Sequence, residues 1–249
     1  MRLPASLAFS RAVPHKTGTC VKRRRFMMDF AEARSLMVEG QVRTYDVTDL
    51  RVLAAMLQVP RERFLPVGRQ ELAYLDRDID VREPGPGGGP RFLLKPAVVA
   101  KLIQSAGIGA GDHVLDVGCA TGYSSALLSR LAATVVALEE DEGLAATAKE
   151  TLSTLGASNV TVMTGALVAG APARAPFDAI LLNGATQIVP KVLIEQLGER
   201  GRLVCVLGQP PIAKAIIFRR TFDHVTQQPL FDAVAPMLPG FAKPTEFAF

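Results

Sequence analysis

Residues 113–125, which read His-Val-Leu-Asp-Val-Gly-Cys-Ala-Thr-Gly-Tyr-Ser-Ser, constrain this chain more than any other stretch. An apolar run of strand length carries an acid, Asp116, and two glycines, Gly118 and Gly122, then enclose small residues. An Ala/Leu/Ser pattern typical of a helix follows directly. The order predicts a strand, a tight turn and a helix start, where a doubly wound sheet offers bare backbone and free helix N–H groups to a ligand. We therefore expect a nucleotide-type cofactor here.

The spacing of small residues in this turn narrows the choice of cofactor. A dinucleotide fingerprint read from Gly118 would need Gly at 120 and Gly or Ala at 123, but the chain has Ala120 and Tyr123. Tyr123 therefore disfavours an NAD-dependent oxidoreductase. A triphosphate loop also fails, because no Lys followed by Ser or Thr closes the turn. The pattern Asp116-x-Gly118-x-Ala120-x-Gly122 instead resembles the first motif of the class I S-adenosylmethionine-dependent methyltransferases.

A second predicted strand, residues 134–139, ends in an acid 17 residues after Gly122. A carboxylate at that point can accept both hydroxyls of an adenosyl ribose, as the acid about 20 residues past a dinucleotide-binding turn does. Glu139 is the first candidate and Glu140 the second. The alternative is a solvated acid that opens the next predicted helix, residues 141–155, where acids favour the N-terminal dipole.

The charge of the chain is unevenly distributed. The formal net charge of all 249 residues is +4, but residues 1–27 carry seven Lys or Arg and no acid. The remainder therefore has 21 basic and 24 acidic residues, a net charge of −3, which does not favour a nucleic-acid partner. Residues 1–27 could be an Arg-rich transit peptide or a basic arm. We favour a disordered extension or an upstream start, because a helical pattern begins near Met27 and Met28.

The cysteines indicate the cellular compartment, the histidines bear on metal binding, and hydropathy bears on membrane partners. Cys20, Cys119 and Cys205 are odd in number and widely spaced, which favours reduced thiols in the cytoplasm over a disulfide framework. The three histidines lack metal-ligand spacing, so no metal is expected. No apolar run reaches the roughly 18 residues that cross a bilayer, so no membrane partner is expected.

Periodicity predicts an N-terminal cap of helices and loops over residues 28–95. Helices are expected at residues 29–41 and 48–59, followed by irregular or short helical structure. Residues 83–90 are too rich in Gly and Pro for an ordered element. A phosphate cradle is a weaker alternative for this loop, because its prolines remove N–H donors.

An α/β domain is predicted over residues 96–249. Pro96 opens a helix through residue 108, and strands and helices then alternate, as in a doubly wound, mostly parallel sheet. With 49% hydrophobic residues, the chain can bury one such core and an appendage. Beyond the two motif strands, further strands are expected at 159–162, 177–182, 201–207, 214–219 and 225–234, with a helix at 189–197.

Several separated motifs in a fixed order resemble the protein-L-isoaspartate O-methyltransferase family over about residues 28–240. They are residues 59–66, Ala73-Tyr74 with Asp76, residues 155–160, residues 176–180 and residues 195–204. The resemblance implies S-adenosylmethionine as cofactor and repair of damaged proteins by methylation of isoaspartyl carboxylates, with a protein or peptide as the substrate. By resemblance, the residues expected at the cofactor are Asp116, Gly118, Cys119, Ala120, Thr121, Gly122, Glu139, Glu140, Gly165, Ala166 and Asn183.

Three departures from the family pattern bear on activity. The family's Thr-Ile-Ser-Gln-like segment, whose Ser lies at the acceptor site, is replaced here by Phe92-Leu93-Leu94-Lys95, with Leu94 at the Ser position. The family's Gly-Asp-Gly is replaced by Gly165-Ala166-Leu167, and Asn183 begins a stretch that is usually small and apolar. The alternative hypothesis is therefore a cofactor-binding homologue with lost or shifted activity. The sequence predicts no oligomeric state.

Overall fold

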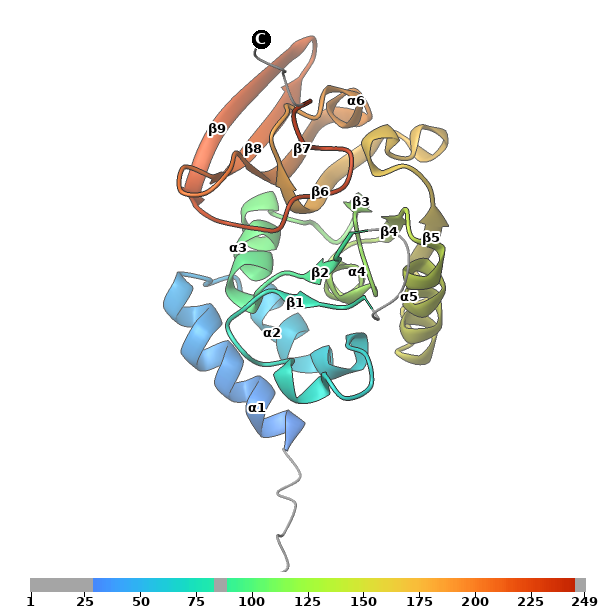
Figure 1. The fold of residues 1–249 in the computed structure, drawn as a ribbon. Coiled ribbons are helices and arrows are strands. Elements are labelled where there is room, and N and C mark those ends of the chain that lie inside the picture. The colour runs from blue at the N-terminus through green and yellow to red at the C-terminus, as the bar shows by residue number, and fades with distance from the viewer. Residues whose placement is uncertain (1–28, 83–88, 245–249) are drawn as a thin grey trace, which may run out of the picture.

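A seven-stranded sheet forms the centre of this computed structural model, which describes residues 29–82 and 89–244 (Figure 1). In spatial order its strands are β5 (Val160–Thr164), β4 (Thr134–Glu139), β3 (His113–Val117), β6 (Phe177–Thr186), β7 (Leu197–Leu207), β8 (Lys214–Thr221) and β9 (His224–Asp232). The predicted basic extension, residues 1–27, lies outside the described residues, as do residues 83–88 of the Gly- and Pro-rich loop.

The strand directions confirm the predicted doubly wound, mostly parallel α/β fold. Strands β5, β4, β3, β6 and β7 pair in parallel, whereas β8 and β9 form an antiparallel edge. After β3, the next two strands in sequence, β4 and β5, lie on one side of it. The following strand, β6, lies on the other side of β3. This reversal of strand order next to β3 creates the crevice at which open α/β sheets bind ligands.

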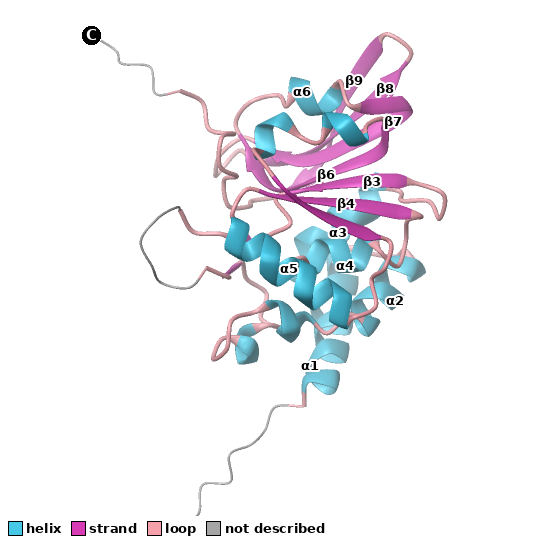
Figure 2. Ribbon diagram, turned by 90° about the vertical axis from the view of Figure 1, so that its right-hand side faces the viewer, coloured by secondary structure: helices cyan, strands magenta, loops and turns pink. Residues whose placement is uncertain are grey.

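Helices cover both faces of the sheet unequally (Figure 2). One face carries α1 (Phe30–Met37), α2 (Leu50–Gln58), α3 (Pro96–Ala106), α4 (Tyr123–Leu128) and α5 (Glu142–Thr154), and the other carries α6 (Lys191–Ile194). A small hairpin, β1 (Ile79–Asp80) with β2 (Phe92–Leu93), lies apart from the main sheet. No helix among the described residues is both long and apolar enough to cross a membrane.

Local capping chemistry explains where several helices begin. Asp29, Asp49 and Asp141 each accept backbone N–H groups of the first turn of α1, α2 and α5, and thereby satisfy donors that have no partner inside the helix. Pro96 occupies the first turn of α3, where its missing N–H costs no hydrogen bond, and Gly107 ends that helix with a positive φ of 59°.

Several element boundaries differ from those predicted by periodicity, and two of them have a clear physical reason. The first helix gives way to a π-helical turn at Val38–Val42 instead of running regularly to residue 41. Strand β6 extends to residue 186 because Ala185 and Thr186 still pair with β7, and Ala185 N–H also donates to the Pro236 carbonyl. The helix expected at 189–197 is only α6, since Phe177 N–H already bonds to the Gln196 carbonyl and draws that segment into β7.

Apolar side chains form one cluster on each face of the sheet. The larger cluster joins α1 and α2 to α3, α4 and the sheet, with Val38, Met56 and Val98 all fully buried. The smaller cluster lies beneath α6. The Gln104 side chain also ties the two N-terminal helices to α3, because its oxygen accepts the N–H groups of Thr48 and Asp49. A separate cap ending at residue 95 stays a prediction.

Candidate active site

The carboxyl ends of β3 and β4 carry the predicted motif turn and the predicted acid side by side. Residues 118–122 follow β3, and Glu139 is the last residue of β4. The two strands are in register, and Gly118 N–H donates to the Leu138 carbonyl across them at 2.8 Å. The turn and the acid therefore meet in the crevice beside β3.

The turn depends on backbone conformations that favour glycine. Gly118 and Gly122 have φ values of 78° and 95°, and Ala120 between them has a φ of 51°. A Cβ atom on Gly122 would lie 3.1 Å from Leu152 and 3.2 Å from Ala148, so this glycine also allows α5 to pack closely. Both glycines therefore serve the local fold of the turn.

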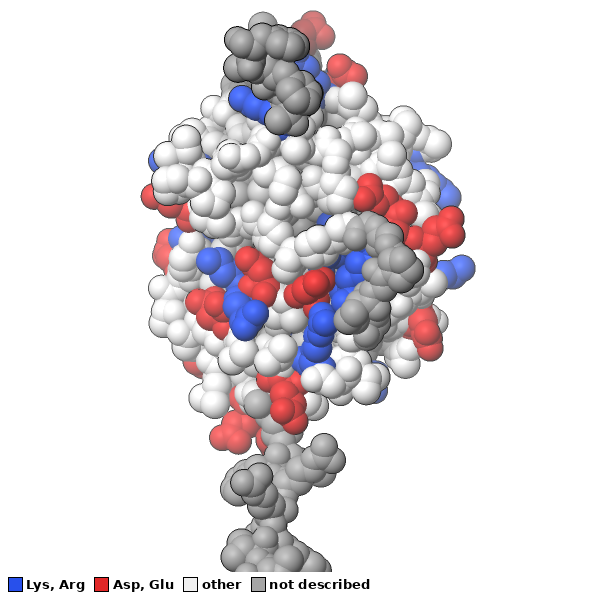
Figure 3. Space-filling model, in the orientation of Figure 1, with Lys and Arg blue, Asp and Glu red and all other residues white. Residues whose placement is uncertain are grey.

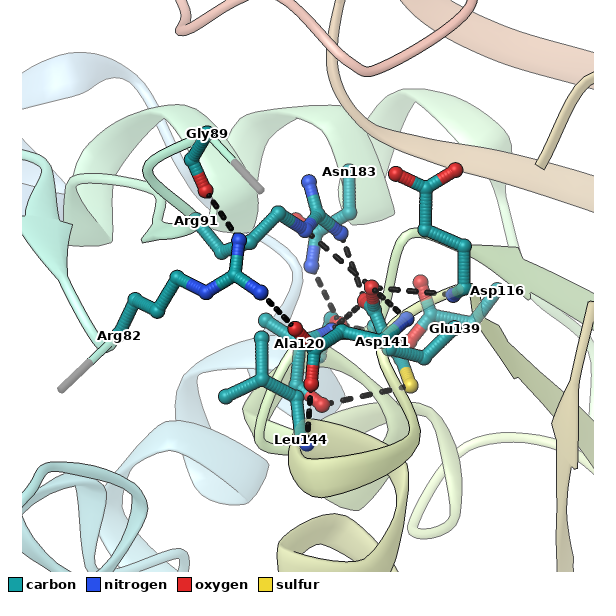
Figure 4. Close-up of polar contacts among 12 residues, drawn as sticks. Arg82, Gly89, Arg91, Asp116, Ala120, Glu139, Asp141, Leu144 and Asn183 are labelled. Atoms are coloured by element: carbon teal, nitrogen blue, oxygen red, sulfur yellow. Dashed lines mark hydrogen bonds and ion pairs between the residues drawn. The ribbon is translucent and has the colours of Figure 1, made fainter. Parts of the chain in front are cut away.

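Glu139 is fully buried and accepts five hydrogen bonds (Figure 4). Its Oε2 atom accepts the Ala120 N–H at 2.7 Å, and its Oε1 atom accepts the N–H groups of Glu140 and Asp141 at 3.1 and 3.3 Å. The Arg91 guanidinium supplies the other two, from Nη2 to Oε2 at 2.6 Å and from Nε to Oε1 at 3.2 Å. The predicted ribose acceptor is thus already occupied by a side chain of the same protein.

A second buried polar cluster lies under the turn. Asp116 Oδ2 accepts hydrogen bonds from Ser124 and Ser125 at 2.6 Å each, and Asn183 donates to Ser124 Oγ at 2.7 Å. Burial raises the pKa of Asp116 to about 6, an effect that the two serine hydrogen bonds oppose. Among the residues that the structure describes, one oxygen of Asp116 and the amide oxygen of Asn183 have no hydrogen-bond partner. These two predicted site residues are therefore joined through serines that sequence reasoning missed.

The side chains of Cys119 and Thr121 are both buried, and Thr121 also lines a cavity of about 410 Å³ beside Phe64. The Thr121 hydroxyl donates to the Phe64 carbonyl at 2.7 Å, which ties the turn to the N-terminal segment. The Cys119 thiol is buried, and burial together with nearby Asp116 raises its pKa well above the usual value. The Thr121 hydroxyl and the Cys119 thiol are therefore engaged with or enclosed by the protein itself.

A cavity of about 480 Å³ adjoins Glu139 and includes three predicted cofactor residues. Its lining consists of Arg82, Gly89, Arg91, Glu140, Asp141, Gly165, Ala166 and Pro239. Arg82 pairs with Asp141 on one wall (Figure 4). On the face of the molecule in Figure 3, basic and acidic side chains alternate across the middle, so an anion meets both signs of charge there.

The space directly above the motif turn is filled by two side chains. A Cβ atom built on Gly118 would lie 2.8 Å from Leu238 Cδ2 and 3.1 Å from Arg91 Nη2. Leu238 comes from the segment after β9, and Arg91 directly precedes β2. Neither residue was a sequence candidate, because a single Arg beside a Gly-rich loop and a single Leu near the end carry no recognisable signal.

The predicted acceptor segment, residues 92–95, runs from β2 into α3. Leu94 is 2% exposed and belongs to the larger apolar cluster, while Phe92 and Lys95 are half-buried. The Leu94 carbonyl accepts a hydrogen bond from the buried Arg61 guanidinium at 2.8 Å. That guanidinium also lies 4.6 Å from the centre of the Tyr123 ring, next to the motif turn. Arg61 therefore links the acceptor segment to the turn.

This fold, with a glycine turn after its first strand and an acid at the end of the next, defines a class I methyltransferase, the class that uses S-adenosylmethionine. The family model of protein-L-isoaspartate(D-aspartate) O-methyltransferase matches residues 32–232. The chain belongs to that family.

Relatives and solved structures agree with this assignment. A Roseiflexus castenholzii protein-L-isoaspartate O-methyltransferase is 39% identical over 220 residues, 88% of this chain and 98% of that protein. One from Methanoculleus marisnigri is 39% identical over 175 residues, 70% of this chain and 77% of that protein. A solved protein-L-isoaspartate O-methyltransferase, 24% identical, superposes with a TM-score of 0.73 over 83% of this chain and 66% of that one. The superposition supports the fold.

Proposed function

We propose that this protein transfers a methyl group from S-adenosylmethionine to the side-chain carboxylate of isoaspartyl residues in proteins or peptides. The observation that carries the proposal is the Glu139 carboxylate, buried at the end of β4 and 2.7 Å from the Ala120 N–H of the glycine turn. Once the two hydrogen bonds from Arg91 are released, this carboxylate is placed to accept a pair of ribose hydroxyls. The family match over residues 32–232 supports the reaction and the substrate class.

The donors and acceptors of the crevice fit the cofactor chemically, provided that Arg91 leaves Glu139 and Leu238 moves away from Gly118. Glu139 would accept the ribose hydroxyls, and the backbone of residues 118–122 would receive the methionine end. Glu140, Gly165 and Ala166 line the adjoining cavity of about 480 Å³ and would face the base. When bound, the cofactor supplies a methyl group on a sulfonium, an electrophile that a carboxylate oxygen can attack while sulfur keeps the bonding electrons.

The acceptor needs positioning rather than a general base, because a carboxylate is already ionised near neutral pH. Burying that carboxylate without donors would be costly, and the family's serine position is the apolar Leu94 here. Lys95 is half-buried at the start of α3 and belongs to no ion pair among residues 29–82 and 89–244. We assign it the role of receiving the acceptor anion.

A second candidate function is a cofactor-binding homologue with a different acceptor or no transfer activity. It is favoured by the apolar residues Phe92 and Leu94 at the acceptor segment.

A cytoplasmic location is supported by Cys119 and Cys205, which are buried free thiols.

Two measurements test the proposal. Calorimetric titration with S-adenosylhomocysteine, with NAD as the control ligand, tests the cofactor; no binding of S-adenosylhomocysteine would refute it. Labelled methyl transfer to an isoaspartyl peptide and to the same peptide with ordinary aspartate tests the acceptor. Transfer selective for the isoaspartyl form is expected, and binding without transfer to either peptide would favour the second candidate.

A further inference from the structure

Arg91 and Glu139 form a two-donor ion pair in which both side chains are buried, at 5% and 0% exposure. We infer that Arg91 competes with the cofactor ribose for Glu139, and so controls how tightly the cofactor binds. This inference rests on the proposed function, since it assumes that S-adenosylmethionine is the ligand of the crevice.

The hydrogen bonds of Glu139 leave no acceptor capacity for ribose hydroxyls. A carboxylate offers about four lone-pair sites, and five N–H groups already point at this one. Three of the five are backbone groups of Ala120, Glu140 and Asp141, which the turn and the end of β4 hold in place. Arg91 alone contributes through a side chain, so it is the donor that a ligand can displace.

The position of Arg91 also separates the cavity from the motif turn. Its guanidinium lines the cavity of about 480 Å³, and its Nη2 atom would lie 3.1 Å from a Cβ atom on Gly118. A ligand that reaches from Gly165 and Ala166 to the glycine turn must pass through this point. Steric overlap and competition for hydrogen bonds therefore act at the same place, where Arg91 contacts Glu139 (contact drawn in Figure 4).

A second carboxylate is available to receive the displaced guanidinium. Glu140 lines the same cavity as Arg91 and is exposed, whereas Glu139 is buried. A move of Arg91 from Glu139 to Glu140 would keep its charge paired and open the ribose position. The apparent affinity of a ligand falls in proportion to the fraction of molecules in the binding-competent arrangement. Pairing of Arg91 with Glu139 thus lowers cofactor affinity.

Competition predicts opposite effects on stability and on affinity when Arg91 is removed. Without its partner, Glu139 is a buried charge held only by backbone groups, so the unliganded protein should be less stable. The same change frees the ribose acceptor, so the ligand should bind more tightly. A purely structural role for Arg91 would lower both quantities, and a role as a ligand contact would lower affinity.

The test compares wild type with Arg91→Ala by calorimetric titration with S-adenosylhomocysteine and by thermal melting without ligand. We expect a lower melting temperature and at least about tenfold tighter binding for the variant, a change equivalent to 1.4 kcal/mol. Arg91→Lys keeps the positive charge but lacks the two-donor fork of arginine. It should therefore also bind S-adenosylhomocysteine more tightly than wild type does. This variant provides the test if Arg91→Ala does not fold.

Arg202→Lys is the matched control. Arg202 pairs with Asp112, also at low exposure, at the opposite end of the sheet. This substitution should weaken a comparable pair without changing S-adenosylhomocysteine affinity. Equal or weaker binding by the Arg91 variants overturns the inference, as does equal tightening by Arg202→Lys. Binding by neither wild type nor the Arg91 variants overturns the proposed function, and the inference with it.

Discussion

Ser124 donates a 2.6 Å hydrogen bond to Asp116 Oδ2 and in turn accepts one from Asn183. Three elements meet in this chain of contacts, because Ser124 lies in the first turn of α4, Asp116 lies in β3 and Asn183 lies in β6. The contacts therefore hold the floor of the crevice together. The unpartnered oxygens of Asp116 and Asn183 make this floor sensitive to protonation.

The buried carboxyl of Asp116 should make stability depend on pH. Burial raises its pKa from 3.8 to about 6 in the folded state, so the unfolded chain loses this proton first as the pH rises. The contribution of Asp116 to stability is then present below about pH 4 and is lost as the pH rises through about 6. Relative to Asp116→Asn, wild type should lose on the order of 3 kcal/mol of unfolding free energy between about pH 4 and pH 7. Urea unfolding across this range measures the difference. If the unfolding free energies of wild type and Asp116→Asn changed with pH in parallel, the raised pKa of Asp116 would be contradicted. Asp223→Asn, at an exposed position, is the control.

Gly118 should tolerate no side chain. Its φ of 78° is strained for alanine, and a Cβ atom there would lie 2.8 Å from Leu238 Cδ2. Gly156 is the matched control, because its φ is 69° and a Cβ atom on it would meet nothing within 4 Å. Gly156→Ala should therefore cost about 1–2 kcal/mol of unfolding free energy, from backbone strain alone. Gly118→Ala should cost more, by the overlap with Leu238. Equal losses in chemical denaturation would show that Leu238 moves aside freely.

Arg61 should be essential for stability although no carboxylate within the described parts of the chain forms an ion pair with it. Its guanidinium is fully buried and donates to the carbonyls of Ala73 and Leu94 at 2.8 Å each. Arg61→Met would leave both carbonyls without this donor, at about 1–3 kcal/mol for each unsatisfied buried group. Arg63→Met, on the same short helix but exposed, should change little. The two variants are compared by urea unfolding, and similar midpoints would refute the role of Arg61.

Lys95 should matter for the acceptor rather than for the cofactor. If its ammonium receives the acceptor carboxylate, Lys95→Gln should lower kcat/KM for an isoaspartyl peptide roughly tenfold or more, since a hydrogen bond to a charged group contributes about 1.5–3 kcal/mol. Lys95→Arg should retain most of the activity. The affinity for S-adenosylhomocysteine should not change in either variant. Unchanged kcat/KM in Lys95→Gln would remove Lys95 from the acceptor site.

Short-range patterns in the sequence predicted the parts of the fold that are set by neighbouring residues. The strand at 113–117, the turn at 118–122 and the strand ending in Glu139 follow from apolar runs, glycine spacing and a terminal acid. All of these signals act within a few residues, because strand alternation, positive φ and helix capping are local properties. The order of the elements along the chain then limits the topology to a doubly wound sheet.

The tertiary structure alone decided what occupies the crevice. Arg91 reaches Glu139 across 48 residues of chain and Asn183 reaches Ser124 across 59, while Leu238 comes from beyond the last strand to cover Gly118. No local pattern marks such pairs, because the burial of a charge and the choice of its partner depend on which distant segments pack together. The sequence therefore determined the glycine turn and the acid that we propose as the cofactor site, and long-range packing determined that a buried arginine already lies between them.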